Sequence, residues 1–96
     1  MARSDARVAT AAPRRYLGQL CKHFQHRLPV TLEETRGRID FPMGSCAVEI
    51  AEGALILRAD AATAEDLATL EDVVARHLVR FGFRETLAVE WTRQPA

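Results

Sequence analysis

The stretch Leu20-Cys21-Lys22-His23-Phe24-Gln25-His26-Arg27 holds two of the three histidines of this chain and one of its two cysteines. Imidazole nitrogen and thiolate sulfur are common ligands of zinc and other transition metals, so Cys21, His23 and His26 are candidate ligands. On a regular helix, however, His26 lies about 140° and His23 about 200° around the axis from Cys21. We therefore expect Cys21 to point into the core, with both histidines at the surface or at an interface.

The third histidine, His77, lies on the apolar face of a second predicted helix. Cys21 and Cys46 are its expected soft neighbours, and a Cys-His pair could act as a nucleophile with its base. No carboxylate or amide that would orient the imidazole is identifiable, nor is a glycine-rich turn for an oxyanion hole. We expect a core histidine that joins helix to sheet, with a metal or redox set of Cys21, Cys46 and His77 as the alternative.

Basic side chains near the end of the same helix are candidates for anion binding. Arg76 and Arg80 are one turn apart and Arg84 follows. The competing interpretation is favourable charge near a helix C-terminus. We expect a binding site either in a pocket between helices and sheet or at a rim formed by His23, His26 and Arg80.

Two amphipathic helices are predicted. The first begins at Pro13, a residue that suits the opening turn of a helix, and ends at Leu28 before Pro29. The second follows a capping-box pattern at Thr63-Ala64-Glu65-Asp66 and runs to Phe81, with Gly82 as its stop signal.

Strands are predicted from alternating apolar residues. Four of them lie between Val30 and Asp60, separated by glycine-containing turns, and shorter ones are expected at 7–10 and 87–91. The order β-α-β-β-β-β-α-β favours an α+β fold, a two-layer sandwich with both helices on one face of an antiparallel sheet. We expect one domain over residues 6–92, with loose ends at 1–5 and 93–96.

Composition excludes several classes of protein. The 96 residues have zero formal net charge, so the chain lacks the electrostatic footprint of a general nucleic-acid or membrane-surface binder. Residues 1–28 carry six basic side chains and one acidic side chain, whereas residues 29–72 carry three basic and ten acidic side chains.

We expect a cytoplasmic protein with reduced thiols, because no secretory signal or 20-residue apolar segment is visible. With no phosphate loop, nucleophile elbow or dinucleotide fingerprint, we expect neither a cofactor nor an enzyme.

Three strings of residues resemble a bacterial family of small proteins, domain-of-unknown-function family 2218. They are Leu20-Cys21-Lys22-His23-Phe24 with His26, Gly37-Arg38-Ile39-Asp40-Phe41-Pro42 with Gly44 and Cys46, and His77-Leu78 with Arg80-Phe81 and Phe83-Arg84. Because domains of this family are sometimes attached to siderophore-interacting flavin reductases, the resemblance implies a link to iron handling. It also draws notice to the cysteines and histidines, which the family pattern contains.

Three functional hypotheses follow. The first is a non-enzymatic accessory domain of iron or siderophore metabolism, with a siderophore-interacting reductase or an iron-uptake protein as partner. The second is a transition-metal or redox-sensing module that uses Cys21, Cys46 and His77. The third is a homodimeric interaction domain that pairs through the open sheet face, where Ala47, Ile56 and Ala88 lie among charged residues.

Overall fold

The computed structural model describes residues 1–82 and 85–95. The elements follow the predicted order β-α-β-β-β-β-α-β. They are β1 (Ala2–Ala9), α1 (Pro13–Phe24), β2 (Val30–Leu32), β3 (Arg36–Phe41), β4 (Gly44–Ala51), β5 (Ala54–Ala61), α2 (Ala64–Phe81) and β6 (Thr92–Arg93).

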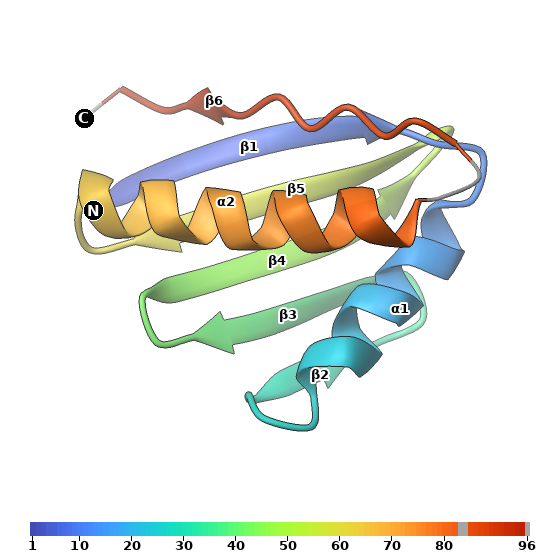
Figure 1. Ribbon diagram of the computed structural model, residues 1–96, viewed down its shortest axis with the longest axis horizontal. Helices are drawn as coiled ribbons and strands as arrows, with labels where there is room; N and C mark the ends of the chain where they lie inside the picture. The colour runs from blue at the N-terminus through green and yellow to red at the C-terminus, as the bar shows by residue number, and fades with distance from the viewer. Residues whose placement is uncertain (83–84, 96) are drawn as a thin grey trace.

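The strands form one six-stranded antiparallel sheet in the order β2-β3-β4-β5-β1-β6. Strands β2 to β5 are the predicted meander, and β1 pairs along the whole of β5. Both helices lie on one face of the sheet, α1 over the β2–β4 side and α2 over β4, β5 and β1 (Figure 1). The predicted two-layer α+β fold is therefore confirmed.

The core fills the space between the helices and this face of the sheet. Thr63 begins α2 by accepting a hydrogen bond from the Asp66 backbone N–H, as the capping pattern predicted. The fully buried large side chains come from both layers. Either helix would therefore expose an apolar stripe if the sheet did not cover it. They are Val8, Leu17, Leu20, Ile39, Val48, Leu55, Leu57, Leu67, Leu70, Val74 and Leu78.

Helix α1 ends at Phe24, four residues before the predicted end at Leu28. The N–H groups of Arg27 and Leu28 both donate to the Phe24 carbonyl, so the chain leaves the helix in a tight turn. Pro29 disfavours helical geometry in the residue before it, which places the break upstream of the proline. This early end brings His26 and Leu28 to a recess that His77 of the second helix also lines.

Strand β1 is longer than predicted because it begins at Ala2 rather than Arg7. Ala2 to Asp5 pair with β5, so the expectation of loose residues there was wrong. Ser4 and Ala6 face the core while Arg3 and Asp5 face solvent. The alternation was present in the sequence, but its inward side chains are too small to give an apolar signal.

The predicted strand at 87–91 is wrong, since only Thr92 and Arg93 pair with β1. Residues 85–91 instead run along the β1 side of the molecule and bury Leu87 (Figure 1). Side-chain contacts hold this segment. Glu85 accepts hydrogen bonds from the Thr10 and Tyr16 hydroxyls, both at 3.1 Å, and Arg93 forms a two-pronged pair with buried Glu71.

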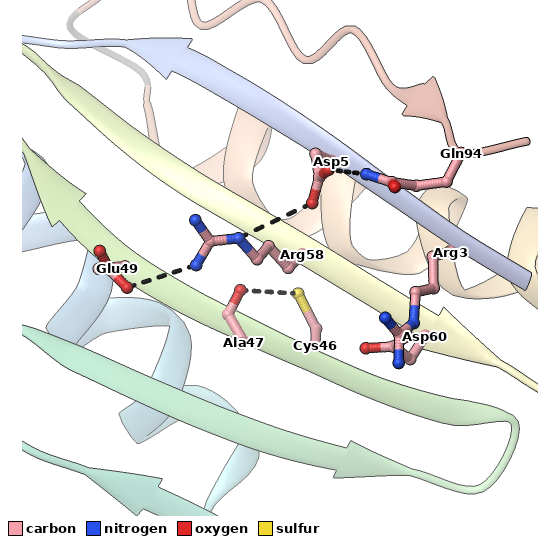
Figure 2. Close-up of polar contacts among 8 residues, drawn as sticks. All are labelled: Arg3, Asp5, Cys46, Ala47, Glu49, Arg58, Asp60 and Gln94. Carbon is pink, nitrogen blue, oxygen red and sulfur yellow. Dashed lines mark hydrogen bonds and ion pairs between the residues drawn. The ribbon is translucent and has the colours of Figure 1, made fainter.

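The open face of the sheet carries charges that pair across neighbouring strands. Arg58 lies between Asp5 at 3.9 Å and Glu49 at 3.4 Å, and Arg3 pairs with Asp60 at 2.7 Å. Figure 2 shows this row of side chains crossing β1, β5 and β4. The facing pairs Arg3–Asp60 and Asp5–Arg58 place opposite charges directly across neighbouring strands, which favours this register of the sheet.

Candidate functional site

A cleft of about 580 Å³ lies where the end of α1 meets α2. All three histidines of the chain line it, His23 from α1, His26 from the turn that follows and His77 from α2. The remaining lining residues are Phe24, Arg27 and Leu28. Its volume falls in the range of ordinary small-molecule sites, and an apolar wall with a few polar groups is their usual lining.

His77 has one ring nitrogen fixed by the fold. Its Nδ1 lies 2.7 Å from the Val73 carbonyl oxygen one turn earlier in α2. Because a carbonyl can only accept, Nδ1 carries the hydrogen and the neutral ring keeps its lone pair on Nε2. The side chain is half-buried at the cleft and contacts α1, so the expectation of a core histidine between helix and sheet was wrong.

His23 packs against His77 with 4.9 Å between the ring centroids and an interplanar angle of 47°. Phe24 and Phe81 approach the same imidazole at 4.9 and 5.5 Å. Partial burial lowers the pKa of His23, and the nearby His77, Arg80 and His26 lower it further. The imidazole is therefore neutral near pH 7 and offers a lone pair rather than a charge.

The apolar wall of the cleft is Phe24. Its ring stacks edge-on against buried Phe41 of β3 at 4.9 Å and contacts His77 at the same distance. Edge-to-face packing fixes the ring between the sheet and both histidines. A ligand in the cleft would meet one aromatic surface and up to three imidazoles.

Arg80 lies one turn beyond His77 on α2, exposed and close enough to His23 to affect its pKa. It lines a neighbouring depression of about 380 Å³ with Ala75, Arg76, Val79 and Val89 rather than the histidine cleft itself. Arg76 is paired with Asp72 at 2.8 Å. The third arginine of the predicted anion site, Arg84, lies outside the described residues.

The two cysteines belong to the core and not to the cleft. Cys21 and Cys46 are free thiols with no exposed surface. Burial raises the pKa of both, that of Cys46 to about 12. In the described part of the chain, no three His, Cys, Asp or Glu side chains are placed to share a metal ion, so Cys21, Cys46 and His77 are not a metal set.

Sequence reasoning identified the three histidines but missed Phe24, Arg27 and Leu28 as lining residues. The predicted helix ran through all three and placed Phe24 and Leu28 on its apolar face, as core residues. The tight turn after Phe24 gathers them instead. Pro29, together with the polar run Gln25-His26-Arg27, was the available signal for an earlier helix end.

Fold and cleft together define a small two-layer α+β domain with a ligand-sized recess between its helices. The chain belongs to the family described as "Uncharacterized protein conserved in bacteria (DUF2218)", whose model matches residues 5–92. The solved structures include a similar protein, PA4090 from Pseudomonas aeruginosa, determined by NMR. It is 35% identical, with a TM-score of 0.81 over 100% of this chain and 98% of that one.

Among curated proteins, none matches the chain. Neither helix in the described residues is long and apolar enough to cross a membrane.

Proposed function

We propose that this domain is a non-enzymatic, cytoplasmic accessory protein of bacterial iron handling that binds a ferric siderophore in the histidine cleft. The observation that supports the proposal best is the gathering of His23, His26 and His77 around one recess of about 580 Å³. The resemblance noted in the sequence supplies the link to iron.

The lining suits a bulky polar chelate. Siderophore complexes present many oxygen atoms and, in the catecholate class, flat aromatic rings. Arg27 and the imidazole N–H groups can donate hydrogen bonds to such oxygens, while Phe24 offers a surface for a ring. Arg80 beside the cleft adds positive charge, which favours an anionic chelate.

The absence of nucleophiles from this lining supports a binding role rather than catalysis. The described residues that line the cleft include no carboxylate, hydroxyl or thiol side chain. An imidazole alone has no partner here to activate as a nucleophile and no acid to orient it.

A siderophore-interacting reductase is the protein partner that the family resemblance suggests. An accessory domain of this size would present the bound ferric chelate to such a reductase. The shallow depression beside Arg80 is lined by apolar Ala75, Val79 and Val89 together with Arg76 and Arg80. It is the surface we propose for that contact.

Isothermal titration calorimetry with ferric hydroxamate and ferric catecholate siderophores tests the proposal. We expect micromolar binding of one class, weakened in the Phe24→Ala and Arg27→Ala variants. Arg58→Ala, on the opposite face of the sheet, is the matched control and should bind as the parent protein does. If no ferric siderophore, haem or reductase bound at micromolar concentration, the proposal would be wrong.

A further inference from the structure

From the geometry of the cleft we infer that His23 and His77 together bind a divalent late first-row transition metal, such as Ni²⁺, Cu²⁺ or Zn²⁺, through one imidazole nitrogen each. The inference shares the cleft of the proposed function and rests on it for the location of the ligand. The chemistry differs from that of siderophore binding, because coordination by the two histidines needs free positions on the metal.

The spacing of the two rings fits a shared ion. Imidazole nitrogen binds these metals at about 2.0–2.1 Å, so two imidazoles at 90° to 110° on one ion have ring centroids roughly 4.5–5.2 Å apart. The observed separation of the His23 and His77 centroids is 4.9 Å. The two rings are tilted by 47° to each other.

The state of each ring also suits a ligand. The hydrogen bond from His77 Nδ1 to the Val73 carbonyl leaves Nε2 as the donor atom, and metal-binding histidines are commonly held through their other nitrogen in this way. The His23 ring packs directly against the His77 ring, so both imidazoles belong to the same part of the cleft. Imidazole is a preferred ligand for copper, nickel and zinc.

The remaining coordination positions must be filled from outside the protein. The described residues place no third His, Cys, Asp or Glu side chain to complete the site. Arg27 and Arg80 add positive charge beside the pair, which disfavours a bare dication. A metal bound to an anionic chelator already has its other coordination positions filled, and the negative charge of the complex suits the two arginines. It must keep two adjacent positions open for the histidines.

Nickel nitrilotriacetate has this composition, since the chelator fills four positions, leaves two adjacent ones open and gives the complex a net negative charge. The probe is therefore the soluble Ni²⁺ nitrilotriacetate complex, titrated calorimetrically into untagged protein. His23→Ala and His77→Ala each remove one of two linked ligands, so we expect binding to weaken by about tenfold or more. His26→Ala is the matched control and should change affinity by less than about threefold, because His26 is not part of the pair.

Two further measurements keep the inference open to refutation if a variant misfolds. His77→Gln retains a donor for the Val73 carbonyl but lacks the imidazole lone pair, so it should fold as the parent does and still lose the metal complex. Electron paramagnetic resonance of the Cu²⁺ iminodiacetate adduct should show coupling to two imidazole nitrogens, and to one in either alanine variant.

Absence of binding by the parent protein, or an equal loss in all three histidine variants, would overturn the inference. A hexadentate ferric hydroxamate or catecholate siderophore has all six iron positions filled by oxygen and cannot be coordinated by the pair. Siderophore binding without nickel binding would therefore contradict the inference alone, and the reverse result would contradict only the proposed function.

Discussion

The hydrogen bond between His77 Nδ1 and the Val73 carbonyl determines which chemistry the cleft can offer. It fixes the tautomer, so that the lone pair is on Nε2 and not within the helix. His23 packs against this ring and is itself neutral near pH 7. At the scale of single residues, the site is a pair of imidazoles in contact beside one phenyl ring.

The pKa of His23 provides a direct test of this environment. Burial and the neighbouring positive groups lower it below the ordinary 6.5, and NMR titration of the His23 ring protons should show this. In His77→Ala the value should rise towards 6.5, because the imidazole is then better solvated. A value at or above 6.5 in the parent protein would contradict the described packing.

The same shift makes stability depend on pH. The unfolded chain protonates His23 at about 6.5, whereas the folded protein does so only at lower pH. The contribution of His23 to stability is therefore complete above pH 6.5 and is lost as the pH falls towards the folded-state pKa.

The thiols should be inert in the native protein. Because Cys21 and Cys46 are fully buried and burial raises the pKa of both thiols, neither forms the thiolate that reacts with disulfide reagents. We expect no reaction with an aromatic disulfide at pH 8 under native conditions and two equivalents in guanidinium. Fast labelling of either cysteine in folded protein would restore the redox-sensing hypothesis.

The orientation of single residues was partly predictable. The helical wheel placed Cys21 inward and His26 outward, as observed. It failed for His77 because the apolar stripe of α2 serves two neighbours. Leu67, Leu70 and Val74 are fully buried in the core, while His77 contacts α1. The period of apolar residues along one helix shows which face is apolar, but not which residues of that face contact the sheet and which contact another helix.

At the scale of elements, α1 lies close to β3 because Gly37 has no side chain. A Cβ atom there would come within 2.6 Å of the Cys21 sulfur and 3.1 Å of the Thr31 carbonyl oxygen. Gly37→Ala should therefore lower the free energy of unfolding by about 1–3 kcal/mol in urea titrations.

Gly18, inside α1, is the matched control. A Cβ atom at this position would meet nothing within 4 Å, so Gly18→Ala should raise the free energy of unfolding by about 0.5–1 kcal/mol through helix propensity alone. Equal effects of the two substitutions would show that the helix does not pack on β3 as described.

Glu85 anchors the segment that follows α2. Its carboxylate accepts from Tyr16 and Thr10, and burial together with Glu85 raises the pKa of the Tyr16 hydroxyl. Glu85→Ala should cost about 1–3 kcal/mol by leaving these hydroxyls without their partner. It should also shift the emission of Trp91 to the red.

Glu90, exposed in the same segment, is the control for this substitution. Glu90→Ala should change stability by no more than about 0.5 kcal/mol and leave the Trp91 emission unchanged. Identical spectra for both variants would mean that the Glu85 contacts do not hold the segment.

Element order and the meander were predictable because each strand and helix has its own apolar period. The strand boundaries at the two ends of the chain were not predictable in this way. Ser4 and Ala6 are too small to mark a strand, and Leu87, Val89 and Trp91 alternate without pairing, because this segment is held by side chains rather than a ladder. Alternation indicates one buried face but does not require backbone hydrogen bonds.

At the scale of the whole molecule, the two faces differ in kind. The helical face contains the cleft, and the open sheet face is a balanced array of ion pairs that includes Arg58, Glu49 and Asp5 (Figure 2). Half-buried Ile56 and Ala47 lie among these charges rather than in an apolar patch. Each of these three charges already has a partner in the same chain, which does not favour the homodimer through this face.

The central claim is that ligands enter the cleft between α1 and α2 and not the sheet face. The most direct test is a ¹H–¹⁵N correlation spectrum of the labelled protein during titration with a diamagnetic gallium siderophore. We expect shift changes concentrated at His23, Phe24, His26, Arg27, Leu28 and His77. Changes centred on Glu49, Arg58 and Asp60, or no saturable change at any residue, would contradict it.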